Sequence, residues 1–149
     1  MQYASGTIGR VFYIRFDHDE DLLAGLQEFI TQNQIASGMV HLIGAVSSGS
    51  LVTGPREPVL PPDPVWDHLS GHELIGTGMI RTGQTGPKLH LHVSAGRGET
   101  VRTGCLRKDC AVYIVIEAVI TEFEGFCIGE SWDERSCLHL PDPSPHLKK

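Results

Sequence analysis

Several signals that mark common function classes are absent from this sequence. Its 12 lysines and arginines form no run and are outnumbered by 18 acidic residues, which gives a net charge of −6. A protein that binds phosphate backbones usually presents a cluster of positive charge. No internal repeat, Gly-rich phosphate loop or Gly-x-Ser-x-Gly elbow occurs either. Direct nucleic-acid binding by this chain alone is therefore disfavoured.

The chain also lacks the signals of export and membrane insertion. No apolar stretch approaches the roughly 18 residues that a membrane span needs, and residues 1–6 have neither the basic region nor the apolar core of a signal peptide. The four cysteines, at 105, 110, 127 and 137, form no Cys-x-x-Cys pair. We expect a cytoplasmic protein with no membrane partner, whose cysteines are thiols or metal ligands rather than disulfides.

The length of 149 residues suits one domain with a real hydrophobic core. We expect this domain over residues 1–128. Residues 129–149 contain prolines at 141, 143 and 145, so we expect a Pro-rich C-terminal extension that is partly disordered beyond Leu140.

Alternating and helical hydrophobic patterns indicate one helix among several strands. Apolar residues recur at helical spacing from Leu22 to about Gln34, after Asp17 and Glu20, which resemble a capping pair. The strands are expected at residues 8–16, 39–46, 49–53, 73–80, 88–95, 100–106 and 111–123. The order predicts an α+β domain with a mixed, mostly antiparallel sheet and one main flanking helix. The last strand, 111–123, is apolar and β-branched, which is typical of a strand buried on both faces. We expect it to be the central strand or one that faces another subunit.

The segment 54–70 contains five prolines and is expected to be a long loop, because proline disrupts central strands and helix interiors. Loops of this length commonly have a function. Trp66, Asp67 and His68 would then cover a site or a neighbouring subunit. The plainer interpretation is a surface loop anchored by its tryptophan.

A pair of histidines stands out on the strand 88–95. Leu89, Leu91 and Val93 alternate with polar residues, so His90 and His92 point the same way, with Cα atoms about 6.6 Å apart. The Gly-Arg-Gly turn at 96–98 would send the chain back and bring Cys105 into range. Imidazole and thiolate both suit zinc, so His90, His92 and Cys105 form a candidate site for a divalent metal.

Plainer interpretations exist for each of these residues. The histidines could be polar side chains on a solvent face, and Cys105 could pack as a small hydrophobic residue. Glu73 begins a neighbouring strand and could be an ordinary surface carboxylate. Next to a metal it would instead be a fourth ligand, or a catalytic general base for a bound water.

Sequence elements spread from about Gly9 to Gly125 resemble the "plants and prokaryotes conserved" (PPC) domain family. The resemblance rests on these elements in this order: Gly9-Arg10-x-Phe12-x-Ile14-Arg15, Glu20-Asp21-Leu22-Leu23, Ile43-Gly44-Ala45-Val46, Glu73-Leu74, Leu89-His90-Leu91-His92-Val93 and Gly104-Cys105-Leu106. Their order and spacing together carry the likeness, since no single element is specific.

The resemblance implies a mixed sheet flanked by a helix and a homotrimer. It also implies association with DNA, because plant members join this domain to AT-hook segments, although no Arg-Gly-Arg-Pro hook occurs here. In prokaryotic members, histidines matching His90 and His92 and a third in a Gly-His-Leu step look like a metal site. Cys105 stands in place of that third histidine.

The fold implied is more distantly similar to acetolactate decarboxylase, a zinc enzyme whose metal is held by a His-x-His pair, another histidine and a carboxylate. Only His90, His92 and Glu73 carry that comparison. Two functions follow as hypotheses. One is an oligomeric PPC module with a bound metal, associated with DNA through a partner. The other is a zinc-dependent lyase or hydrolase acting on a small oxygenated molecule.

Overall fold

The computed structural model describes residues 1–143, which form one helix and ten strands. Their bounds are β1 Thr7–Asp17, α1 Leu22–Gln32, β2 Gly38–Val46, β3 Gly49–Pro55, β4 Pro64–Leu69, β5 His72–Gly83, β6 Gly86–Arg97, β7 Thr100–Lys108, β8 Val112–Glu124, β9 Gly129–Asp133 and β10 Leu138–Asp142. This part of the chain contains no helix with the length and apolar character needed to cross a bilayer.

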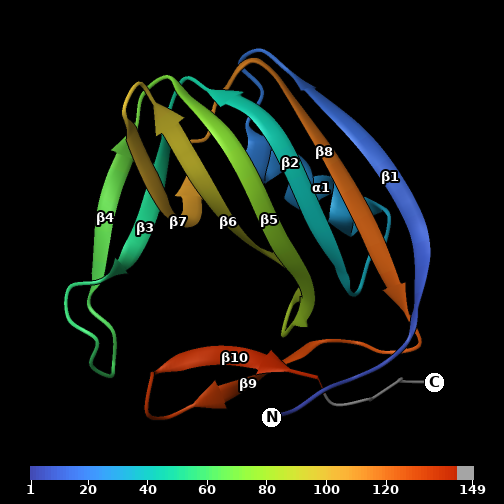
Figure 1. The fold of residues 1–149 in the computed structure, drawn as a ribbon. Coiled ribbons are helices and arrows are strands. Elements are labelled where there is room, and N and C mark those ends of the chain that lie inside the picture. Colours follow the sequence, from blue (N-terminus) through green and yellow to red (C-terminus); the bar gives the residue numbers. More distant parts are fainter. Residues whose placement is uncertain (144–149) are drawn as a thin grey trace.

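Eight of the strands form one sheet in the order β1-β8-β2-β5-β6-β7-β3-β4. The sheet curves around α1, and β9 and β10 form a separate hairpin below it (Figure 1). Every pairing among the described strands of the large sheet is antiparallel, where the sequence predicted some parallel pairing as well. The predicted α+β class, with one flanking helix on a mostly antiparallel sheet, is confirmed.

The helix covers one face of the sheet, which we call the inner face. Leu22, Leu26 and Ile30 follow one another at helical spacing and are fully buried against the core side chains of the strands. The helix begins at Leu22, as predicted, but its capping residue is Asp21 and not Asp17. The carboxylate of Asp21 accepts a hydrogen bond from the amide of Ala24. Gln27 ties the helix to β6 by donating to the carbonyl of Pro87.

The outer face, opposite the helix, is open on β8. Ile116, Ala118 and Ile120 point into the core, whereas Tyr113 and Val119 are exposed. In the single chain this strand is thus buried on one face only, and it lies second from the edge of the sheet rather than at its centre. The alternative, that the strand faces another subunit, stays a prediction. The β-branched run reflects one face packed on the core and one apolar face that the described residues leave uncovered.

The proline-rich segment contains a strand that the sequence reading missed. Residues 64–69 form β4, which lies at the edge of the sheet and, among the described strands, pairs with β3 alone. Proline is tolerated on edge strands because one side needs no ladder hydrogen bonds, so Pro64 can begin this strand. Trp66 lies within it, opposite Val52. The irregular loop is thus confined to residues 56–63.

The chain after β8 folds back beneath the sheet. Ile128 accepts a hydrogen bond from the amide of Thr82 and donates its own amide to the hydroxyl of Ser37, which fixes the entry to β9. β9 and β10 pair from Leu138 opposite Asp133 to Asp142 opposite Gly129. The sequence reading did not predict this hairpin. The disorder expected beyond Leu140 is wrong for Pro141 and Asp142, which lie in β10. Residues 144–149, which the same expectation covers, lie outside the described residues.

Candidate metal centre

The register between β6 and β7 builds the cluster that the sequence predicted. His92 pairs directly with Cys105, and His90 lies two residues along the same strand, so all three side chains share the outer face. The ligand atoms of His90, His92 and Cys105 all lie within 4.8 Å of one another. The two Nε2 atoms are 3.2 Å apart, with the rings edge to face.

Glycines allow the strands around the cluster to pack closely. A Cβ on Gly104, the residue before Cys105, would lie 2.3 Å from the carbonyl oxygen of Val52. A Cβ on Gly78 would lie 2.8 Å from the carbonyl oxygen of His90. The strands on either side of Gly78 pair with it in regular register, without a bulge.

The geometry of the cluster fits a tetrahedral zinc ion. With Zn–N distances of about 2.0–2.1 Å, two ligand nitrogens at tetrahedral angles lie roughly 3.3 Å apart, close to the 3.2 Å between the histidine nitrogens. Cys105 is the third donor, and its Sγ lies within 4.8 Å of the ligand nitrogens of both histidines. Two imidazoles and one thiolate leave one position of a tetrahedron to another ligand.

Burial and neighbouring positive charge keep His90 neutral. Desolvation, the adjacent His92 and the guanidinium groups of Arg81 and Arg107 lower the pKa of His90 to about 4. A neutral imidazole is the form that binds a metal. Burial raises the pKa of Cys105, while Arg107 and Arg81 act in the opposite direction. Metal binding at this site would therefore release the thiol proton.

Glu73 is not brought to the cluster. It pairs with Gly96 on β6, whereas His92 pairs with Thr77, so Glu73 lies four residues, about 13 Å, further along the sheet. It shares the outer face with the histidines but is exposed at the far end of the strand. The role predicted for Glu73 has no geometric support.

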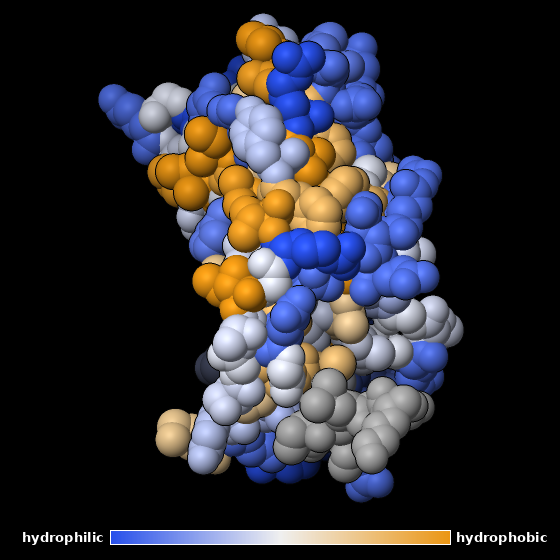
Figure 2. All heavy atoms as spheres, turned by 90° about the vertical axis from the view of Figure 1, so that its right-hand side faces the viewer, coloured by the Kyte–Doolittle hydropathy of each residue, from blue (hydrophilic) through white to orange (hydrophobic). Residues whose placement is uncertain are grey.

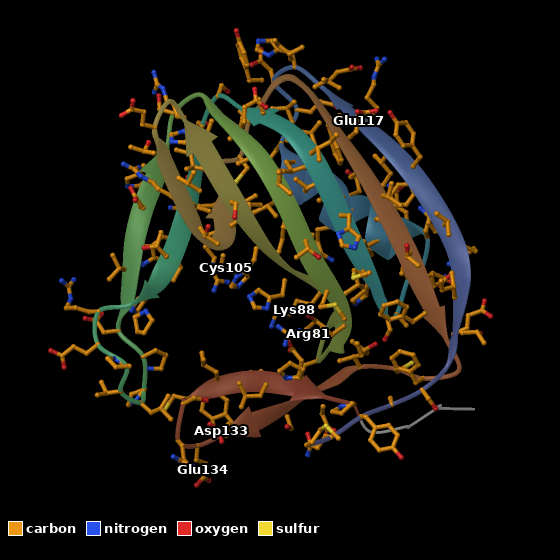
Figure 3. All side chains as sticks on the ribbon, viewed as in Figure 1. Arg81, Lys88, Cys105, Glu117, Asp133 and Glu134 are labelled. Atoms are coloured by element: carbon orange, nitrogen blue, oxygen red, sulfur yellow. The ribbon has the colours of Figure 1, made fainter. Side chains whose placement is uncertain are left out.

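A different carboxylate lies close to His90. Glu130 on β9 is almost completely buried, with only 3 % of its side chain exposed, and its negative charge raises the pKa of His90 against the larger effects of burial and the cations. Its Oε1 lies 3.5 Å from Nε of Arg81 and its Oε2 lies 3.2 Å from Nζ of Lys88. Figure 3 shows Arg81 and Lys88 on the side of the sheet that faces the β9–β10 hairpin, with Cys105 nearby.

A pocket of about 410 Å³ lies between His90 and the hairpin. Its charged lining residues are Arg81, Lys88, Arg107 and Glu130. The sequence reading missed Arg107, although it follows Cys105 by two residues and so shares its face of the strand. It also missed Glu130, which no local pattern could place here, because its position depends on the docking of the hairpin.

The sequence profile of the Plants and Prokaryotes Conserved (PCC) domain, also abbreviated PPC, matches residues 3–124. This chain belongs to that family. The matched segment of this PPC protein contains β1 to β8 and the three cluster residues, and it ends before the β9–β10 hairpin. No curated protein sequence gives a significant match to the chain.

Solved structures share the fold over most of the chain. A metal-containing protein from Archaeoglobus fulgidus is 24% identical, with a TM-score of 0.83, over 95% of this chain and 99% of that one. A protein from Bacteroides thetaiotaomicron, provisionally named as DNA-binding, is 22% identical, with a TM-score of 0.75. The match covers 95% of this chain and 97% of the Bacteroides chain. A Staphylococcus aureus protein described as similar to α-acetolactate decarboxylase is 11% identical, with a TM-score of 0.53. The match covers 79% of this chain and 53% of the Staphylococcus chain.

Proposed function

We propose that this PPC protein is a metal-binding module that holds one zinc ion through His90, His92 and Cys105. The observation that carries the proposal is the convergence of two imidazoles and one thiol within 4.8 Å on adjacent strands. The Archaeoglobus protein, which shares this fold, is described as metal-containing, and this description supports the proposal. Two nitrogens and one sulfur favour zinc over magnesium or calcium, which prefer oxygen ligands.

The metal content of the purified protein tests this proposal. We expect about one zinc per chain in the unmodified protein and loss of the metal in the Cys105→Ser and His92→Ala variants. Cys127→Ser and His41→Ala are matched controls, because neither residue belongs to the cluster. Folded variants that retain zinc at the level of the controls would refute the ligand set.

We also propose that the chain assembles as a homotrimer through its outer face. An outer apolar patch crosses four neighbouring strands and consists of Val11, Tyr13, Ile43, Ile75 and Val119, all exposed in the single chain. Figure 2 shows apolar side chains gathered on the side of the molecule formed by β1 and β8. Such a patch on a soluble domain marks an interaction surface.

Sedimentation analysis tests the assembly. Ile75→Glu places a charge at the β5 end of the patch and is expected to reduce the trimer to smaller species, since a buried unpaired carboxylate is costly. Val59→Glu adds the same charge on the exposed loop 56–63 and should leave the mass unchanged. A monomeric unmodified protein would contradict the proposal.

For DNA, we propose an indirect role through a partner protein. The net charge of −6 opposes close approach to a phosphate backbone. Gel retardation by the isolated protein should be absent, or lost at modest salt. Tight binding that resists salt would overturn this conclusion.

A zinc-dependent lyase or hydrolase is a second candidate function, favoured by the pocket beside His90. A zinc with three protein ligands keeps an open position, at which it can polarise a carbonyl or activate water. The visible spectrum of cobalt-substituted protein tests this arrangement. Added azide should change the spectrum if the fourth position is open, and a spectrum that azide leaves unchanged would rule out the enzyme.

A further inference from the structure

The pocket between the sheet and the β9–β10 hairpin is positively charged, although the protein as a whole is acidic. Arg81, Lys88 and Arg107 contribute three cations to its wall, against the single carboxylate of Glu130. The whole chain has a net charge of −6. Positive charge concentrated in a partly enclosed pocket attracts anions, because low-dielectric walls strengthen the local field.

The cations in the pocket differ in how they are paired. Arg81 and Lys88 both approach Glu130, at 3.5 Å and 3.2 Å, so its charge is shared between them. Arg107 forms no ion pair or hydrogen bond with residues 1–143. Arg107 is thus the cation left available to an external anion.

The buried pair in the pocket is itself incompletely satisfied. Nε of Arg81 and Oε1 of Glu130 are buried and have no hydrogen-bond partner among the described residues. These two atoms nevertheless face each other at 3.5 Å as an ion pair, so the charge of Glu130 is directed at Arg81 and Lys88. Glu130 therefore leaves the charge of Arg107 uncompensated.

The remaining wall indicates what kind of anion fits. Much of the lining is apolar, from Leu89, Trp132, Leu138, Leu140 and Pro141. A ligand that fills this pocket therefore has an apolar body as well as a charged head. The planar guanidinium of Arg107 matches a carboxylate through two parallel hydrogen bonds. An inorganic anion would leave the apolar wall uncovered.

We propose that the pocket binds a small organic carboxylate, with its carboxylate on Arg107 and a short aliphatic body against Trp132 and the apolar side chains of β10. The ligand would lie beside His90, so this inference extends the proposed metal site. Arg107 needs no metal to bind a carboxylate. Binding to metal-free protein consequently separates the failure of this inference from the failure of the zinc site.

Calorimetric titration of the full chain with 3-methylbutanoate, with and without chelator, tests the proposal. The neutral amide of the same acid and inorganic phosphate are the comparison probes. The chain has two tryptophans, so a Trp66→Phe variant keeps Trp132 as its one tryptophan. The fluorescence of that variant therefore reports on the pocket. We expect 3-methylbutanoate to bind and to change this fluorescence, while the amide and phosphate bind at least about tenfold more weakly.

Variants then assign the binding to Arg107. Arg107→Gln should weaken binding about tenfold or more. Arg107→Lys should retain part of the binding, since lysine keeps the positive charge but lacks the planar pair of donors. Arg56→Gln removes an exposed charge on the distant loop and should bind like the unmodified protein. Equal binding of acid and amide, equal binding of phosphate, or unchanged binding by folded Arg107→Gln would each overturn the proposal.

Discussion

The two faces of the sheet are built from the same alternating strands but have different surroundings. The inner face consists of leucine, isoleucine and valine side chains that are buried beneath α1. The outer face carries His90, His92 and Cys105 together with the outer apolar patch. The candidate metal ligands and the exposed apolar side chains thus lie on the face that the helix leaves free, whereas the side chains of the inner face form the core.

Two alanine substitutions on β8, one on each face, test most directly whether the two faces differ. Ile120 is fully buried on the inner face, and its neighbour Val119 is 37% exposed on the outer face. Ile120→Ala should lower the free energy of unfolding by about 2–5 kcal/mol, because it leaves a cavity. Val119→Ala should cost less than about 1 kcal/mol within a subunit. Urea denaturation measures both, and equal losses would show that the two faces are equivalent.

Metal binding on the outer face should increase the free energy of unfolding of the chain. Zinc at about 100 times its dissociation constant should stabilise the folded chain by about 2.7 kcal/mol, since it binds the folded state through His90, His92 and Cys105. Thermal unfolding with zinc and with chelator measures the difference. His92→Ala should abolish it and His41→Ala should not. A zinc effect that persists in folded His92→Ala would place the metal elsewhere.

The helix that covers the inner face depends on its cap. Asp21→Ala removes the acceptor for the amide of Ala24 and should cost about 1 kcal/mol of stability. Asp17→Ala is the control, because Asp17 forms an exposed ion pair with Arg15 and should change the stability by less. Chemical denaturation of the two variants compares them. A larger loss for Asp17→Ala would restore the cap predicted from the sequence.

The smallest expected effect concerns pH, because His90 is only partly buried and water screens its charge. The folded pKa of His90 is about 4, below the value of about 6.5 in an unfolded chain. The unfolded state therefore binds more protons between these values, and stability falls as the pH drops from about 6.5 towards 4. In metal-free protein, His90→Gln should flatten this dependence in denaturation curves. An unchanged slope would show that His90 titrates normally.

Much of the fold could be predicted from local patterns. Alternation and one β-branched apolar run predicted seven strands of the large sheet, and helical spacing predicted α1, because these patterns depend only on local side chains. The cap of α1 and strand β4 were missed. Both depend on neighbours: Asp21 is positioned by the turn after β1, and Pro64 is acceptable only because β4 lies at a sheet edge.

The sequence by itself determined the candidate metal ligands. His90 and His92 share a face because they are two residues apart on a strand, and the short turn at 96–98 returns the chain so that Cys105 lies opposite them. These relations involve few residues and short separations. Only the tertiary structure decided that Glu73 lies away from the cluster and that Arg81, Lys88 and Glu130 surround a pocket beside it. Those placements depend on pairing and docking between segments far apart in the chain, which no local pattern specifies.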